Sequence, residues 1–177
     1  MKHILITGGA GFIGSNTVQY ALKLGLKVTV LDSFESAAVS IDFLEKLDVN
    51  ILEMDIQDRQ SLEELNEEFD AIIHLAAQVS VPKSIQDPLR NHTVNVDGTE
   101  HILQLAQRND VKRFIFASSS AVYGDCETMP LKESYSGELQ SPYAQSKSDI
   151  ESRIDTKFQE GCEFVSLRFF NVYGPNQ

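Results

Sequence analysis

Tyr143 and Lys147 stand four residues apart in the stretch Tyr143-Ala144-Gln145-Ser146-Lys147. This spacing predicts that the two side chains share one face of a helix, and Pro142 suits the start of that helix. A phenol with a pKa of about 10 is a poor base at neutral pH. A neighbouring ammonium and a second positive charge nearby would both favour the phenolate, and lowering the pKa by about three units requires about 4 kcal/mol from the two together. The pair is therefore a candidate for general-base chemistry on a hydroxyl group.

Three consecutive serines, Ser118, Ser119 and Ser120, follow an apolar run and precede Val122-Tyr123-Gly124. A serine in this place can hydrogen-bond a substrate hydroxyl and relay its proton to a tyrosine. The serines open the longest irregular stretch, about 119–141, and so long a loop in a compact domain is usually functional. Each pattern alone also fits an ordinary loop or helix turn, so the case depends on what precedes them.

A glycine-rich turn, Gly8-Gly9-Ala10-Gly11-Phe12-Ile13-Gly14, follows the first apolar run and opens the first amphipathic stretch. Glycines at this spacing allow a tight turn, close approach of the backbone to a pyrophosphate, and packing of a helix on a strand. The helix that follows presents free N–H groups and its positive dipole end to phosphates. Strand, turn and helix occur together, which predicts a dinucleotide-binding site rather than a structural turn.

Asp32 ends the second apolar run, 18 residues after Gly14. A carboxylate at this position accepts hydrogen bonds from the adenosine ribose and repels a 2′-phosphate. No arginine occurs in the following stretch 33–40. We therefore expect NAD rather than NADP as the cofactor, with Asp32 and the adjacent Ser33 in its binding site.

Short apolar runs alternate with amphipathic stretches along the chain, which is typical of an α/β fold. Strands are predicted at Ile4–Thr7, Lys27–Leu31, Asn50–Glu53, Ala71–Leu75, Arg113–Ala117 and Glu163–Leu167, each buried on both faces. Helices are predicted at about Ile13–Leu24, Ser61–Glu68, Asp87–Arg108 and Tyr143–Phe158. Right-handed crossovers then favour a doubly wound parallel sheet of the Rossmann type, with residues 1–177 as one NAD-binding domain.

The composition is that of a globular protein, with 42% hydrophobic and 23% charged residues among 177. The formal net charge of −11 argues against nucleic acid as a partner, and the acidic segment 63–70 is interpreted as a solvated helix face. Two cysteines without CxxC spacing predict neither a disulfide framework nor a zinc site, and they suit a reducing compartment. With no apolar run long enough for a signal or a membrane span, we expect a cytoplasmic protein without a membrane partner.

The motifs together resemble the N-terminal half of the extended short-chain dehydrogenase/reductase family, in particular its nucleotide-sugar epimerases. The stretches that carry the resemblance are Thr7–Ser15, Met54–Ile56, His74–Gln78, Asn95–Thr99, Ser118–Gly124, Tyr143–Lys147 and Arg168–Pro175. The resemblance implies that Tyr143 is the catalytic base, that Lys147 binds the nicotinamide ribose and polarises Tyr143, and that Ser119 relays the proton. Ser118 and Ser120 are the near alternatives to Ser119.

The same resemblance implies a set of further binding residues. Asp55 and Ile56 would flank the adenine, and Asn95 would hold the loop near the nicotinamide. Phe170 would meet the cofactor, and Asn171 the phosphates of a sugar nucleotide. The remaining cofactor-binding positions are Gly8, Gly11, Phe12, Ile13, Gly14, Leu75, Ala76, Ala77, Val79 and Ser118, and the sugar would meet Ser119, Ser120 and Tyr143.

The reaction can be narrowed by residues that the family's other branches carry. Its dehydratases have an acidic pair directly after the catalytic hydroxyl residue, and its decarboxylases have a glutamate directly before Val-Tyr-Gly. Here those positions are Ser120 and Ala121. The resemblance therefore implies a 4-epimerase of the UDP-glucose/UDP-galactose type that acts by transient oxidation at sugar C4. A reductase or dehydrogenase of the same family, or a non-catalytic NAD-binding module, are the alternatives.

Two more expectations concern the length of the chain and its assembly. Members of this family are nearly twice as long, and a second, smaller domain supplies most contacts to the sugar nucleotide, so we expect that domain to be lacking here. The family also implies a homodimer through the helices at 87–108 and 143–158.

The four histidines, His3, His74, His92 and His101, have no metal-ligand spacing, and we expect no metal site.

Overall fold

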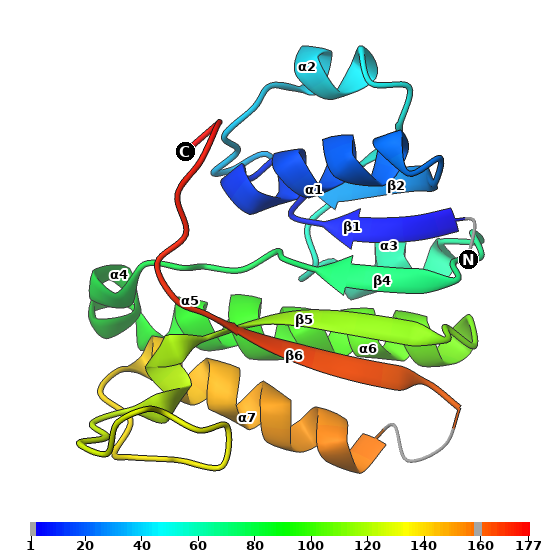
Figure 1. Cartoon of the computed structure of the whole chain (residues 1–177). Helices are drawn as coiled ribbons and strands as arrows, with labels where there is room; N and C mark the ends of the chain where they lie inside the picture. The colour runs from blue at the N-terminus through cyan, green and yellow to red at the C-terminus, as the bar shows by residue number, and fades with distance from the viewer. Residues whose placement is uncertain (1–2, 158–160) are drawn as a thin grey trace.

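Six parallel strands run side by side in the order β3-β2-β1-β4-β5-β6 (Figure 1). The structure is a computed structural model, and it describes residues 3–157 and 161–177. The strands are β1 (His3–Thr7), β2 (Lys27–Asp32), β3 (Asn50–Glu53), β4 (Ala71–His74), β5 (Arg113–Ser119) and β6 (Glu163–Phe169). The prediction of a doubly wound parallel sheet is confirmed, and all six predicted strands are present within two residues of their expected ends.

The helices depart further from expectation than the strands. They are α1 (Phe12–Lys23), α2 (Ile41–Glu45), α3 (Arg59–Glu64), α4 (Val81–Gln86), α5 (Pro88–His92), α6 (Thr99–Arg108) and α7 (Pro142–Lys157), with a π-helix η1 (Thr93–Gly98) and a 3₁₀-helix η2 (Ser120–Tyr123). The prediction missed the short α2 and α4, which begin at Ile41 and Val81, directly after the N-cap serines Ser40 and Ser80. The helix predicted at 61–68 ends at Glu64, and Phe158 lies outside the described residues.

The helix predicted over 87–108 is divided into α5, η1 and α6. The Thr99 hydroxyl donates to the carbonyl of Asn95 at 2.7 Å, and a side-chain bond of this kind competes with the helical ladder. Gly98 lies so close to Ile56 that a Cβ would come within 2.7 Å of its side chain. The π turn thus packs against the segment after β3. π turns within helices are frequently found at functional sites.

Two apolar cores hold the two faces of the sheet. On one face α1 and α2 cover β1 and β2 through a cluster that includes Ile6, Val18 and Leu44. On the other face α3, α6 and α7 cover the sheet through a larger cluster, in which Phe114 and Ile150 are fully buried. Each face thus receives the helices that right-handed crossovers dictate.

The expectation that every strand is buried on both faces is wrong for the edge strand β3, in which no residue is buried, and for β5 and β6. Along β5, buried Phe114 and Phe116 alternate with partly exposed Ile115. On β6, Val165 and Leu167 are each 40% exposed. They lie beside Ile115 and Ala117 in the strand register, so one face of this half of the sheet is only lightly covered. α1 and α2 reach only the other half (Figure 1).

His74, at the end of β4, is 1% exposed, and both ring nitrogens have hydroxyl partners. Because the Thr99 hydroxyl donates to the Asn95 carbonyl, its oxygen accepts the Nε2–H of His74 at 2.9 Å. Nδ1 then accepts from the Thr7 hydroxyl at 2.7 Å. Burial lowers the pKa of His74 to about 3, and the charge of Lys147 acts in the same direction. The neutral ring therefore joins β1, β4 and α6, which confirms it as a structural histidine.

The charge state of His74 predicts sensitivity to acid. Between its ordinary pKa of 6.5 and about 3 the unfolded chain binds a proton that the folded chain excludes, so stability falls as the pH falls, by up to about 1.4 kcal/mol per pH unit. Urea unfolding from about pH 7 to about pH 4 should show a shallower loss for His74→Gln than for the wild type. His92→Gln, at a half-exposed position, is the control and should keep the wild-type slope. Equal slopes in all three proteins would contradict the assignment.

Candidate functional site

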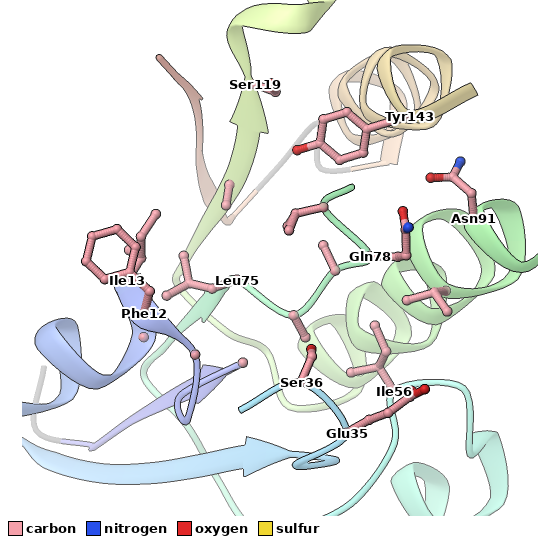
Figure 2. A pocket seen from close by; sticks show the side chains of 18 of the residues that line it. Phe12, Ile13, Glu35, Ser36, Ile56, Leu75, Gln78, Asn91, Ser119 and Tyr143 are labelled. Carbon is pink, nitrogen blue, oxygen red and sulfur yellow. The ribbon is translucent and has the colours of Figure 1, made fainter. Parts of the chain in front are cut away.

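A cleft of about 1200 Å³ opens where β1, β2, β4 and β5 end. Ligands bind at this edge of open α/β sheets, where the strand order reverses. The predicted residues that line it are Gly8, Gly11, Phe12, Ile13, Gly14, Asp32, Ser33, Asp55, Ile56, Leu75, Ala76, Ala77, Val79, Ser118, Ser119, Tyr143, Lys147, Phe170 and Asn171. Asn95 and Ser120 do not line the cleft. Figure 2 shows Phe12 and Ile13 on one side of it and Tyr143 on another.

The glycine turn at 8–14 forms one end of the cleft. Gly8 has a φ of +70°, and a Cβ there would lie 2.6 Å from the amide nitrogen of Ala76. A Cβ on Gly14 would lie 2.0 Å from the carbonyl oxygen of Gly8, so only glycine permits this packing. The N-cap of α1 is Gly11, which supplies no side-chain acceptor. The first N–H groups of α1 therefore lack a side-chain cap and can serve an anionic ligand.

Asp32 closes the turn from β2. Its carboxylate accepts hydrogen bonds from the amides of Ala10 and Phe34, both at 2.8 Å, and the residue is 9% exposed. An ionised carboxylate has about four acceptor sites, so two amides leave capacity for hydroxyl groups of a ligand. The carboxylate thus shapes the glycine turn while it borders the cleft.

The adenine-side residues come from the segment after β3. The carboxylate of Asp55 accepts from the backbone and side-chain amides of Gln57, at 2.8 and 3.0 Å, and Ile56 is 4% exposed. In Figure 2, Ile56 lies across the cleft from Leu75. The loop after β4, residues 75–79, supplies the wall between this region and Tyr143.

The first turn of α7 fixes the position of Tyr143. Its backbone amide donates to the Ser84 hydroxyl at 3.3 Å, and the carbonyl of Pro142 accepts from the side chain of Asn91 at 3.1 Å. The Ser141 hydroxyl accepts from the amide of Ala144 at 3.1 Å. α4 and α5, which pack on α7, therefore set where the phenol enters the cleft.

Lys147 lies one turn further along α7 and is 3% exposed. Its Nζ donates to the carbonyl of Ala117 at 2.8 Å and lies 4.7 Å from the ring centroid of Phe116 and 5.9 Å from that of Tyr143. Burial lowers the pKa of Lys147 to about 7, and the charge of Glu151 opposes this shift. The amine can therefore exchange its proton near neutral pH.

The chain's own residues do not by themselves lower the pKa of Tyr143. Burial raises the pKa, and hydrogen bonding with the Ser119 side chain lowers it by less. The sequence-based expectation of a lowered pKa relied on a charged lysine and on a second positive charge, that of the nicotinamide ring, and burial brings the pKa of Lys147 itself to about 7. A phenolate at Tyr143 thus requires a further positive charge.

The three serines point in different directions, as alternation along a strand requires. Ser119 borders the cleft, caps η2 by accepting from the amide of Ala121 at 3.2 Å, and acts on the pKa of Tyr143. Ser118 is 3% exposed, and its hydroxyl faces Glu151, whose pKa it helps to lower. Ser120 lies in η2, away from the cleft. Of the three, Ser119 is the one placed beside Tyr143.

Asn95 lies behind the wall of the cleft rather than in it. Its side-chain oxygen accepts from the backbone amide of Gln78 at 2.8 Å, and its amide group donates to the Gln78 carbonyl at 2.9 Å. The same amide group donates to the side-chain oxygen of Asn91 at 2.9 Å. These buried amides link the loop after β4 to η1 and to the start of α7, so Asn95 acts on the cleft through that loop.

The segment after β6 returns across the cleft to α1 (Figure 1). The Asn16 side chain donates to the carbonyl of Pro175 at 2.8 Å, and Asn176 donates to the Ser15 hydroxyl at 3.2 Å. Phe170 is 61% exposed where this segment begins, and Asn171 borders the same cleft. Phe170 and Asn171 therefore lie on a segment that continues from β6 at one end and is hydrogen-bonded to α1 at the other.

These features form a cradle that accepts a dinucleotide and ends at a tyrosine and a lysine. The family model described as "NAD dependent epimerase/dehydratase family" matches residues 4–177. The chain belongs to this family.

Relatives in this family are similar over almost the whole chain. The UDP-glucose 4-epimerase of Mus musculus is 37% identical over 191 residues, which cover 99% of this chain and 55% of the mouse protein. The structure of the Thermus thermophilus UDP-glucose 4-epimerase in complex with NAD has a TM-score of 0.91 and 37% identity, covering 99% of this chain and 57% of that one. The UDP-N-acetylglucosamine 4-epimerase of Methanobrevibacter ruminantium gives the same four values. The chain thus spans little more than half the length of these relatives.

Sequence reasoning missed two cations that border the cleft of this epimerase/dehydratase-family chain, Lys83 and Arg90. Arg90, on α5, pairs with Glu35 of the loop after β2. The absence of arginine from 33–40 therefore did not mean that no arginine is near that loop. Only the fold brings them together, because 55 residues separate Arg90 from Glu35.

The expected absence of a membrane span and of a metal site can be compared with the described residues. Within residues 3–157 and 161–177, no helix has the length and apolar character needed to cross a bilayer. Within the same ranges, no three His, Cys, Asp or Glu side chains gather as a metal site would require. The Nδ1–H of His101 donates to the carbonyl of Ile56 at 2.9 Å, which is a structural contact.

The buried amine of Lys147 predicts a stability effect that depends on pH. Between about pH 7 and its ordinary pKa of 10.5 the unfolded chain holds a proton that the folded chain lacks, so wild-type stability rises with pH through this window. Lys147→Met should therefore stabilise the fold most at or below about pH 7, with a gain that shrinks as the pH rises. Urea unfolding across this range measures the gain. Lys23→Met, at an exposed position on α1, should show no such trend, and a pH-independent gain at Lys147 would contradict the prediction.

Proposed function

We propose that this chain is the cofactor-binding domain of an NAD-dependent nucleotide-sugar 4-epimerase that acts by transient oxidation at sugar C4. The observation that carries the proposal is one continuous cleft with the glycine turn at one end and Ser119, Tyr143 and Lys147 at the other. A hydroxyl, a phenol and an amine in this arrangement suit removal of a proton from an alcohol. The family membership and the names of the relatives support the same reaction.

The chain's residues fit NAD as the cofactor. The glycine turn leaves space that any Cβ would fill, and the uncapped start of α1 suits the pyrophosphate. Asp32 would accept the ribose hydroxyls with the acceptor sites that Ala10 and Phe34 leave open. The dinucleotide, when bound, supplies the acceptor and donor of hydride and a positive charge on its nicotinamide ring.

The reacting groups are assigned from their surroundings. Tyr143 would take the proton of the sugar 4-hydroxyl, with Ser119 as the relay between them, and would return it when the 4-keto sugar is reduced on its other face. Because burial raises the pKa of Tyr143, the base depends on Lys147 and on positive charge in the cleft. Both proton transfers occur at the same oxygen, so the epimerisation consumes neither proton nor cofactor.

Sugar-nucleotide substrates are proposed from the family and from the residues after Ser119. Ser120 and Ala121 supply no carboxylate for elimination or decarboxylation, which supports simple epimerisation. A UDP-hexose is the substrate class that the relatives' names support. Asn171, on the segment that crosses the cleft, is the proposed contact to its phosphates.

We also propose a homodimer in which α5, η1, α6 and α7 of two copies pack together. Leu89 on α5 is 74% exposed, and Ile85 on the preceding helix α4 is 59% exposed. The family resemblance is the main support for this dimer, and these two side chains could contribute to its contact. Sedimentation of the purified chain over a range of concentrations would detect the association.

Epimerisation is tested by incubating the chain with NAD⁺ and UDP-galactose and following the anomeric signals by proton NMR. We expect UDP-glucose to form without accumulation of NADH, and Tyr143→Phe to lower the rate at least about a hundredfold while NAD still binds. Tyr20→Phe, 65% exposed on α1, is the matched control. Accumulation of NADH would point to a dehydrogenase instead. Cofactor binding without conversion would leave a binding module, and an active Tyr143→Phe would remove Tyr143 from the mechanism.

The role of Asp32 is tested by titrating NAD and NADP against Asp32→Ala. Loss of a hydrogen bond to a charged group should weaken NAD by about tenfold to a hundredfold. Loss of repulsion should bring the affinity for NADP closer to that for NAD. Loosening of the glycine turn would weaken both cofactors alike, so the ratio of affinities is the informative quantity. Asp42→Ala, on the exposed side of α2, should leave that ratio unchanged, and an unchanged ratio in Asp32→Ala would refute the ribose contact.

A further inference from the structure

Glu151 and Arg168 form a partly buried ion pair beside Lys147. Glu151 lies one helical turn beyond Lys147 on α7, and its side chain is 15% exposed, against 24% for Arg168 on β6. The guanidinium contacts both carboxylate oxygens, with Nη2 at 2.7 Å from Oε2 and Nε at 3.1 Å from Oε1. The Ser166 hydroxyl donates to Oε1 at 3.0 Å. The pair has the fork geometry that makes such bonds strong and directional.

Arg168 also holds the region that contains Ser119. Its Nη1 donates to the carbonyl of Glu133 at 2.8 Å, in the loop after η2. Its guanidinium carbon lies 4.8 Å from the ring centroid of Tyr123, the last residue of η2. Ser119 caps the other end of this 3₁₀-helix. One side chain on β6 thus connects α7, η2 and the loop between them.

We propose that Glu151 and Arg168 are positioning residues for Lys147 and Tyr143. The ion pair fixes α7 against β6 and η2, and it holds a negative charge one turn from the Lys147 amine. The inference rests on the proposed function insofar as that function gives Lys147 and Tyr143 their roles. The geometry of the pair itself does not depend on it.

The electrostatic part of the proposal follows from the groups that face Lys147. They are Tyr143 and Glu151 on α7, and His74 on β4, which burial keeps neutral. Glu151 is therefore the negative charge that opposes the burial of the ammonium. Burial alone would raise the pKa of Glu151, but its hydrogen bonds, that from Arg168 foremost, lower it. Arg168 thus keeps Glu151 ionised while partly neutralising its field.

A second Arg–Glu pair also involves β6 and provides a matched comparison. Arg113, the first residue of β5, pairs with Glu163, the first residue of β6. Arg168 lies toward the other end of β6. Their side chains are 45% and 70% exposed. Solvent screens such a pair, and neither residue is among the charges that act on Lys147. Removing the Arg113–Glu163 pair should alter the surface of the sheet without changing the electrostatic environment of the Lys147 amine.

The proposal is tested by measuring the pKa of Lys147 by NMR in the folded chain, with ¹³C-labelled lysine and no added cofactor or sugar nucleotide. The Lys147 signal is identified by its loss in Lys147→Met. Glu151→Gln should lower this pKa by about half a unit or more, because the attractive charge is removed. Arg168→Met should raise it, because the hydrogen bonds from Ser118 and Ser166 still favour ionised Glu151, and the field of this carboxylate is no longer neutralised. Arg168→Lys keeps the charge and should restore a value near that of the wild type.

Opposite shifts from the two members of one ion pair distinguish the proposal from a merely structural role, which would move the pKa in one direction or not at all. Glu163→Gln is the control and should leave the Lys147 pKa unchanged. If Arg168→Met does not fold, Glu151→Gln combined with Arg168→Met should lower the pKa by less than Glu151→Gln alone. Equal shifts in those two proteins, or no shift in Glu151→Gln, would overturn the proposal. Because the titration involves no turnover, its result is independent of whether the chain epimerises sugars.

Discussion

Lys147 is an amine buried at the centre of the site, and much of the surrounding structure compensates for its burial. A lone buried charge is costly unless it is paired or gives up its proton. Here the carbonyl of Ala117 supplies the direct partner, the rings of Phe116 and Tyr143 cover the amine, and the Glu151 carboxylate supplies an opposing charge. The amine is therefore close to the point at which it gains or loses a proton at neutral pH. That property suits a group which must respond to charge formed nearby.

The other end of the cleft is organised by a different constraint, the exclusion of side-chain atoms. The backbone of Gly8, the loop after β4 and the start of α1 approach so closely that even a methyl group has no space. The two ends are joined by β4 and β1 and by the neutral His74, which bridges Thr7 to Thr99. A rigid sheet thus sets the distance between the phosphate-binding turn and the reactive side chains, while loops supply the specific contacts.

Sequence patterns predicted the strands, the doubly wound parallel sheet and the glycine turn, because these depend on local apolar runs and on glycine spacing. Most other residues of the cleft were predicted from the family resemblance. The patterns did not predict the π turn at η1, which arises from a tertiary approach between Gly98 and Ile56. They also did not predict that burial alone raises the pKa of Tyr143, since burial is a property of the whole fold. Arg90 and Arg168 escaped notice for the same reason, because each meets its partner only after the sheet has formed.

The lightly covered half of the sheet has a consequence for how the isolated chain behaves. β6 is the last strand in the sheet order, and Val165 and Leu167 on it are 40% exposed beside Ile115. A strand at an open edge presents a row of backbone donors and acceptors to any other extended chain, and here an apolar strip lies next to that row. The exposed Arg113–Glu163 pair lies at one end of it, and the more buried Arg168 lies toward the other. Substitutions along β6 should therefore affect the solubility of the chain at high concentration more than its folding. A lysine in place of Val165 would increase that solubility.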